Sequence, residues 1–183
     1  MPNWCNNTIT IQGSTETLKT LWEEAQTALR CEDADGNITQ EFGLLSAMRP
    51  MPSELEGTTS PSPDGSECWY SWRVNNWGTK WDIGNDGLEF TDNGDGTSSI
   101  TGWFDSAWAP PVAALDSFAE DMDGVHIELF YHEPGMCFVG YYSSEGGDDY
   151  YEYESKDDIP EYLMDHFGLE EWFDEMDEEM EDA

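Results

Sequence analysis

Hydrophobic and polar positions alternate with two different periods along the chain, and each period predicts one kind of element. Residues 7–12 (NTITIQ) alternate Thr with Ile, which predicts a strand. Apolar residues then recur at helical spacing over residues 18–29, behind Ser14, a residue type that caps helix N-termini. We therefore predict a strand followed by an amphipathic helix over residues 14–30.

The second half of the chain shows the same two periods. Residues 88–91 lie between two turn-forming segments and, like residues 99–104, are expected to form a strand. Two prolines open a helical pattern over residues 110–122. Residues 125–131 and 136–142 flank a Glu-Pro-Gly turn, and we expect them to form a hairpin.

The middle of the chain is less regular. Residues 31–68 are expected to be mostly loop, with a Pro/Ser/Gly-rich insertion at about 43–67. Aromatic residues make residues 68–74 and 80–83 strand candidates, with a turn over residues 75–78.

The resulting order is strand-helix-strand-strand-helix-strand with one extra strand. This order predicts an α+β fold, a ferredoxin-like antiparallel sheet with two helices on one face. We assign residues 1–143 to this domain and residues 144–183 to an acidic C-terminal extension, expected to be helical. Five apolar residues of the extension share one side of the predicted terminal helix: Leu169, Trp172, Phe173, Met176 and Met180. That side should dock on the domain while the carboxylates face solvent.

Five segments, taken in order, resemble a known family. They are MPNWCNN at the start, PMPSEL ending at residue 55, NNWGTKWD at 75–82, FDSAWAPP at 104–111 and ELFYHEPGMCFVGY at 128–141. Together they resemble the YubB-like ferredoxin-fold family of phage and plasmid proteins, formerly a domain of unknown function. The resemblance covers about residues 1–143 and implies a ferredoxin-like domain from a mobile element. It implies no established activity and no catalytic residue.

Charge is the most extreme property of the sequence. The chain has 41 acidic and six basic residues, and its formal net charge is −35. Direct binding of DNA or RNA is not expected, because affinity for phosphates depends on Lys and Arg. Self-repulsion of this size disfavours the compact state. A strongly basic partner would offset the repulsion, whereas solubility or adaptation to high salt is the other explanation.

The acidic terminal helix suggests a function. Carboxylates one helical turn apart stand about 6 Å from each other, similar to phosphates along a nucleic-acid strand. The candidate partner-binding residues are Glu170, Glu171, Asp174, Glu175, Asp177, Glu178, Glu179 and Asp182. We expect an acidic nucleic-acid mimic that inhibits a basic host nucleic-acid-binding protein, such as a restriction or CRISPR defence complex. The alternative is a non-catalytic accessory or structural protein whose acidity serves solubility or salt adaptation.

Catalytic motifs are absent from the sequence, which has no nucleophile elbow, phosphate loop or HExxH. We therefore expect no enzyme, and an enzyme with a Trp-lined pocket is the third choice. The candidate pocket residues are Trp77, Trp81, Trp103 and Trp108, although large aromatic residues more often anchor a core. Aromatic residues on an open sheet face can also stack RNA bases, and Phe130, Phe138 and Tyr142 are candidates. The charge opposes that use, and the acidic helices are expected to cover the same face.

The remaining expectations concern metals and location. Four cysteines are spread along the chain without a CxxC pair, so we expect reduced thiols and neither metal nor cofactor. No apolar stretch reaches the roughly 18–20 residues of a membrane span. A cytoplasmic protein is expected, in the host cytoplasm if it is phage-encoded.

Overall fold

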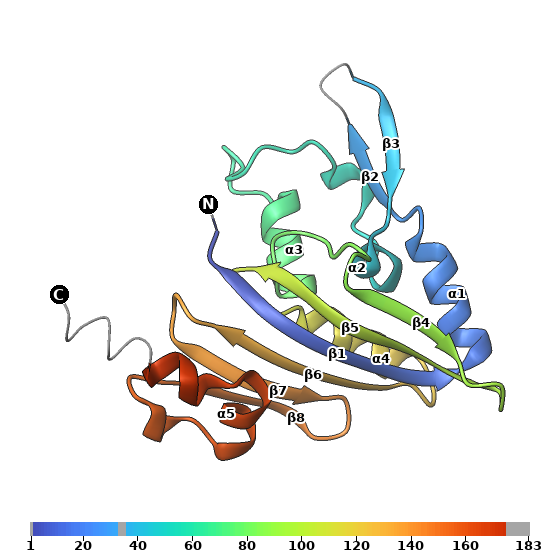
Figure 1. Cartoon of the computed structure of the whole chain (residues 1–183). Coiled ribbons are helices and arrows are strands. Elements are labelled where there is room, and N and C mark those ends of the chain that lie inside the picture. Colours follow the sequence, from blue (N-terminus) through green and yellow to red (C-terminus); the bar gives the residue numbers. More distant parts are fainter. Residues whose placement is uncertain (1, 33–35, 175–183) are drawn as a thin grey trace.

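The computed structural model describes residues 2–32 and 36–174. Six strands form the main antiparallel sheet: β1 (Trp4–Ser14), β4 (Leu88–Asp92), β5 (Thr97–Ala107), β6 (His126–Glu133), β7 (Phe138–Ser143) and β8 (Gly147–Glu152). Their order in the sheet is β4-β5-β1-β6-β7-β8 (Figure 1). A separate hairpin consists of β2 (Leu29–Glu32) and β3 (Ile38–Glu41). The helices are α1 (Thr15–Ala25), α2 (Leu44–Met48), α3 (Trp69–Trp77), α4 (Val112–Asp121) and α5 (Glu161–Phe167), with short 3₁₀ turns at Ser53–Leu55 and Lys156–Asp158.

The ferredoxin-like part is the unit β1-α1-β4-β5-α4-β6. Its four strands are neighbours in the order β4-β5-β1-β6, the arrangement expected of two interleaved strand-helix-strand units. Leu18 of α1 and Leu115 of α4 lie in one buried core with Ile9 and Ile11 of β1. Both helices therefore pack on the same face of the sheet, and the predicted α+β, ferredoxin-like fold is confirmed.

The two faces of the sheet follow from the alternation along β1. Cys5, Ile9 and Ile11 are buried in the core beneath the helices. The even-numbered residues Asn6, Thr8 and Thr10 point to the opposite face, which we call the outer face. There Thr8 lies between Trp103 of β5 and Phe130 of β6. Because paired residues in antiparallel strands point to the same side, these three side chains share the outer face.

The C-terminal segment crosses to the outer face after β8. Five buried residues form a second apolar cluster there: Val139, Tyr153, Ile159, Leu163 and Leu169. Helix α5 and residues 169–174, which are also helical, lie over β7 and β8 (Figure 1). The extension predicted as helical from residue 144 thus begins with a strand, β8, that continues the main sheet.

The prediction of strands over residues 68–74 and 80–83 was wrong. Residues 69–77 form helix α3, and residues 80–83 form no strand. The Ser71 hydroxyl accepts from the backbone N–H of Cys68 at 3.0 Å and so caps the start of α3. Gly78, with φ of 88°, ends it in the left-handed conformation that glycine adopts most easily. The helix buries Trp72 and Trp77 in the core, and this burial outweighs the strand preference of aromatic residues.

The first predicted helix was also too long. Helix α1 ends at Ala25, and Leu29 begins the hairpin β2–β3 in a region expected to be loop. Leu29 continues the helical spacing of α1, so its position in the sequence did not distinguish a longer helix from the start of a strand. Within the predicted insertion at 43–67, only α2 and the turn Ser53–Leu55 are regular.

Candidate functional site

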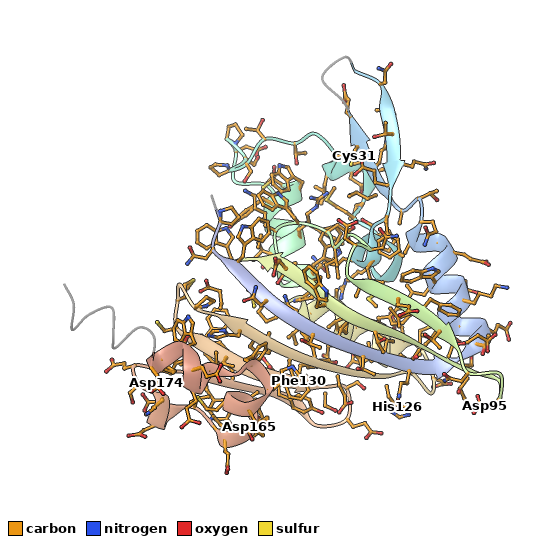
Figure 2. All side chains as sticks on the ribbon, viewed as in Figure 1. Cys31, Asp95, His126, Phe130, Asp165 and Asp174 are labelled. Carbon is orange, nitrogen blue, oxygen red and sulfur yellow. The ribbon has the colours of Figure 1, made fainter. Side chains whose placement is uncertain are left out.

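Twelve carboxylates gather on the segment that follows β7. All twelve belong to exposed residues: Glu145, Asp148, Asp149, Glu152, Glu154, Asp157, Asp158, Glu161, Asp165, Glu170, Glu171 and Asp174. We call this set the C-terminal acidic surface. Lys156 is the only Lys or Arg within residues 145–174. Figure 2 shows Asp165 and Asp174 on the segment that carries α5.

The apolar cluster beneath fixes this surface to the sheet. Trp172 and Phe173 are half-buried against the cluster, whereas Glu170, Glu171 and Asp174 are exposed. The Trp172 ring meets Tyr153 and His132 edge-on, with centroid distances of 6.5 and 5.9 Å. One side of this short helical stretch is therefore docked and the other faces water. The remaining predicted partner-binding residues, Glu175, Asp177, Glu178, Glu179 and Asp182, lie outside the described residues.

Few local contacts neutralise these charges. Lys156 reaches Asp174 at 3.7 Å, in an ion pair whose side chains are both at least half exposed. Asp158 instead accepts hydrogen bonds from the backbone N–H groups of Glu154 and Ser155, both at 3.0 Å. These bonds lower the pKa of Asp158, because they favour its charged form. The surface therefore carries a dense negative charge at neutral pH.

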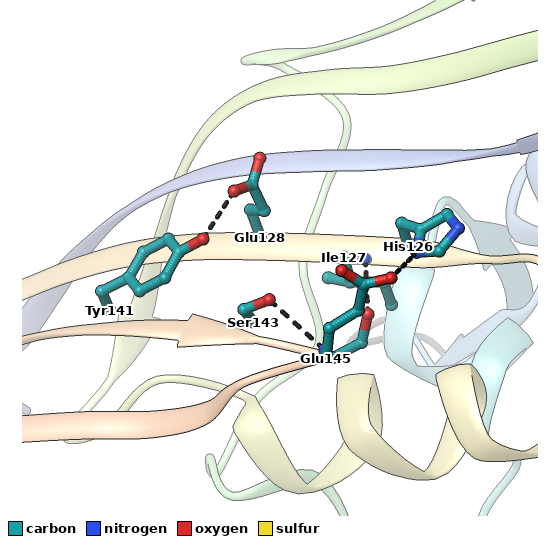
Figure 3. Close-up of polar contacts among 7 residues, drawn as sticks. His126, Ile127, Glu128, Tyr141, Ser143 and Glu145 are labelled. Carbon is teal, nitrogen blue, oxygen red and sulfur yellow. Dashed lines mark hydrogen bonds and ion pairs between the residues drawn. The ribbon is translucent and has the colours of Figure 1, made fainter.

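A shallow groove borders this surface where β6 meets the turn after β7. Its volume is about 330 Å³. Here His126 Nδ1 lies 3.1 Å from a carboxylate oxygen of Glu145, and the Tyr141 hydroxyl donates to Glu128 at 2.5 Å (Figure 3). These contacts hold Glu145 in place and add one further carboxylate, that of Glu128, at the edge of the outer face. They supply no activated nucleophile.

The four tryptophans of the candidate pocket do not meet. Trp77 is fully buried in the main core, and its indole N–H donates to the carbonyl oxygen of Arg49 at 2.8 Å. Trp103 lies on the outer face with 61% of its surface exposed. Trp81 packs against Trp4, with 5.7 Å between ring centroids, and Trp108 is also exposed. The sheet therefore separates Trp77 from Trp103, and no shared Trp pocket forms among the described residues.

Comparison with known proteins now assigns the domain. The model of the ferredoxin-like domain in Api92-like proteins matches residues 76–180, more than half of the chain. The chain belongs to this family. The match runs through β8, α5 and the acidic segment as far as residue 180.

The fold of this Api92-like domain is also found in a solved structure. The chain is similar to the crystal structure of a protein api92 from Yersinia pseudotuberculosis, with a TM-score of 0.54 and 12% sequence identity. The alignment covers 85% of this chain and 99% of that one. At this identity the similarity shows the fold alone. No curated protein matches the chain.

The Api92-like sheet does not expose the three aromatic residues that were candidates for stacking RNA bases. Phe138 and Tyr142 are buried in the main core beneath the helices, on the side opposite the outer face. Only Phe130 points outward, and the ring of His166 from α5 covers it. The residues of β7 that face outward are Val139 and Tyr141, each one position away from a residue predicted to do so. Neighbouring residues of a strand alternate between the two faces, so this shift exchanges them.

The cysteines and the other metal-binding residue types are dispersed. Cys5, Cys31, Cys68 and Cys137 are all free thiols. Within residues 2–32 and 36–174, no three His, Cys, Asp or Glu side chains form a group that could hold a metal ion. No helix in that part of the chain is long and apolar enough to cross a membrane.

The structure also brings together a pocket that the sequence did not predict. It is lined by Trp69 and Arg73 of α3, by Trp81, and by residues of the hairpin β2–β3. The available signal was the spacing of α3, in which Arg73 lies four residues after Trp69 and four before Trp77. The incorrect strand prediction hid this spacing.

Proposed function

We propose that the C-terminal acidic surface mimics nucleic acid and that the protein inhibits a basic host nucleic-acid-binding protein. A restriction or CRISPR defence complex is the class of target that fits best, given the phage or plasmid source implied by the sequence resemblance. The observation that carries this proposal is the C-terminal acidic surface itself, twelve exposed carboxylates with one lysine in a segment of 30 residues.

The docked arrangement supports recognition of a groove. Carboxylates on a fixed surface lose less conformational freedom on binding than carboxylates on a loose tail. A basic groove that normally holds phosphates would gain favourable contacts and relieve the self-repulsion of the acidic surface. Association should be fast, and salt should weaken it strongly.

The test compares two triple variants with the same loss of charge. One variant carries Glu170→Gln, Glu171→Gln and Asp174→Asn on the C-terminal acidic surface. The matched control carries Glu24→Gln on α1 with Glu120→Gln and Asp121→Asn on α4, all exposed on the helical side of the sheet. Each protein competes with a fluorescent DNA duplex for purified restriction enzymes and CRISPR effector complexes across a salt series.

The parent protein should displace the duplex from at least one target. The surface variant should compete about tenfold less well with a flatter salt dependence, because it loses contacts rather than only net charge. The control should stay close to the parent. Failure of the parent to displace nucleic acid from any target would end the proposal. Equal effects of the two variants would show that the C-terminal acidic surface is not the site that binds the target.

The second candidate is acidity for solubility or salt adaptation, and one observation favours it. Exposed carboxylates also occur far from the C-terminal acidic surface, for example Glu24 on α1 and Asp121 on α4. Figure 2 shows Asp95 at the opposite end of the molecule from Asp165. Under this alternative, the two triple variants should lower solubility and change the salt dependence of stability by the same amount.

A further inference from the structure

A pocket of about 650 Å³ lies between helix α3 and the hairpin β2–β3. This volume is within the roughly 300–1,000 Å³ typical of small-molecule sites. Its walls combine apolar surface from Trp69, Trp81 and Met51 with the side chains of Arg30 and Arg73. Two of the six basic residues of a chain with net charge −35 therefore line one pocket.

Arg73 is held in place by aromatic rings rather than by a carboxylate. Its guanidinium carbon lies 4.8 Å from the ring centroid of Trp77 and 5.3 Å from that of Trp69. The Nε atom is enclosed and has no hydrogen-bonding partner. Within residues 2–32 and 36–174, no carboxylate forms an ion pair with Arg73. Burial lowers the pKa of Arg73, but an arginine side chain remains charged in proteins.

Two carboxylates whose charge acts on Arg73, those of Asp82 and Glu56, are already engaged. Asp82 accepts hydrogen bonds from the backbone N–H groups of Leu45 and Ser46, at 2.8 and 3.0 Å. Glu56 forms an ion pair with Arg30 at 3.0 Å. A partly buried cation without a paired anion is unfavourable, because burial removes water that would otherwise solvate it. The pocket is therefore preorganised for an anion from outside the chain.

We propose that this pocket binds a small organic monocarboxylate with a planar apolar body. The terminal N–H groups of Arg73 match the two oxygens of a carboxylate, while Trp69 and Trp81 offer apolar walls for a planar ring. Lys80, whose Nζ lies 4.6 Å from the Trp81 ring centroid, adds positive charge beside that wall. This site is separate from α5 and residues 169–174, which carry five carboxylates of the C-terminal acidic surface and lie over β7 and β8 on the outer face of the sheet.

The charge of the protein selects against anions with several charges. Glu32 and Glu56 also line the pocket, and the whole chain carries −35. Repulsion from these charges grows with the charge of the ligand, whereas the attraction comes mainly from one partly buried guanidinium. A single carboxylate is therefore favoured over a nucleotide or another polyanion.

The experiment uses three probes that share one naphthalene ring, namely 2-naphthoate, 2-naphthamide and 2-naphthyl phosphate. Binding to the full chain is measured by calorimetry and by ligand-observed NMR at neutral pH. We expect 2-naphthoate to bind about tenfold more tightly than the neutral amide, because a charge-assisted pair with arginine is stronger than a neutral hydrogen bond. The doubly charged phosphate should bind more weakly than the carboxylate and improve as salt screens the repulsion.

Variants test the role of Arg73. Arg73→Gln should remove the preference for the carboxylate, and Arg73→Lys should retain part of it. The control Lys19→Gln removes the same charge from the exposed face of α1 and should change nothing. Near-ultraviolet circular dichroism shows whether each variant keeps the packing of its tryptophans.

Two results would overturn the proposal. One is that the parent protein binds 2-naphthoate and 2-naphthamide with equal affinity, or binds neither of them at millimolar concentration. The other is a folded Arg73→Gln or Arg73→Lys variant that binds 2-naphthoate as the parent does. If 2-naphthyl phosphate binds more tightly than 2-naphthoate, the proposed ligand class is wrong and the pocket prefers a phosphate.

Discussion

The imidazole ring of His166 lies parallel to the phenyl ring of Phe130, with 3.9 Å between their centroids and 10° between their planes. This contact joins α5 to the centre of the outer face. Partial burial lowers the pKa of His166, which favours the neutral ring that suits an apolar stack. The position of the C-terminal acidic surface therefore depends on aromatic packing against β6.

Trp172 should be important for this docking. Its ring is half-buried against His132 and Tyr153, so Trp172→Ala should destabilise the segment by about 2 kcal/mol, less than truncation of a fully buried Trp. Hydrogen exchange should show faster opening of residues 153–174 while β1 stays protected. The control Trp103→Ala removes an exposed Trp from the outer face and should have a small effect. Unchanged exchange after Trp172→Ala would contradict the docked arrangement.

Acid should weaken the same region through His132. Burial lowers the pKa of His132 to about 4, whereas an unfolded His titrates near 6.5. Between these values the unfolded chain takes up a proton that the folded chain does not. Stability is therefore lost as pH falls through this window, by up to about 3 kcal/mol. Unfolding free energies measured from pH 7 to 4 should show this loss.

Protonation of the many carboxylates relieves repulsion in the same pH range and acts in the opposite direction. The informative quantity is thus the difference between the parent and His132→Phe, which lacks the titrating ring. His166 and the carboxylates are present in both proteins, so their contributions largely cancel. A difference that does not change with pH would show that His132 titrates normally in the folded protein.

Asp82 should be essential for the region around α2. Its carboxylate accepts from the backbone N–H groups of Leu45, Ser46 and Ile83. Asp82→Ala leaves these donors without their partner and should cost about 2–3 kcal/mol in the free energy of unfolding. Chemical denaturation measures this loss, and the exposed Asp86→Ala serves as control. Equal midpoints for the two variants would rule out this role.

The thiols should react in an order set by exposure. Cys137 is exposed, whereas Cys5 is fully buried and its pKa is raised by burial. Iodoacetamide should therefore label Cys137 first and Cys5 only when the core opens, which mass spectrometry of timed digests can follow. Stoichiometric zinc, or a mass shift of a disulfide, would contradict the expectation of reduced, metal-free cysteines.

Local patterns were sufficient for the parts of the fold where one periodicity dominates. Strand β5 and helix α4 were found from alternation and from the paired prolines at its start. Helix α3 was missed because its aromatic residues favour strands in isolation, and only burial of Trp72 and Trp77 makes the helix favourable. The hairpin β2–β3 has largely exposed residues, so no hydrophobic pattern marks it.

The candidate sites differ in the same way. Exposure of Glu170, Glu171 and Asp174 follows from their helical spacing relative to Trp172, which is a local property. The Trp pocket depended on the relative positions of distant elements, and the sheet between Trp77 and Trp103 prevents it. The pocket around Arg73 was unpredictable for a related reason, since its walls come from α3 and from a hairpin that the sequence did not indicate.

Strand β8 forms one border of the main sheet, and no strand within residues 2–32 and 36–174 pairs with its outer edge, where a second copy could add a strand. That strand carries Asp148, Asp149 and Glu152 beside Tyr150 and Tyr151. Two such edges brought together at neutral pH would place like charges opposite one another, which disfavours pairing through this edge. Protonation of these carboxylates removes that barrier and leaves two adjacent tyrosines on an open edge. Mild acid should therefore turn this border into the preferred starting point for aggregation.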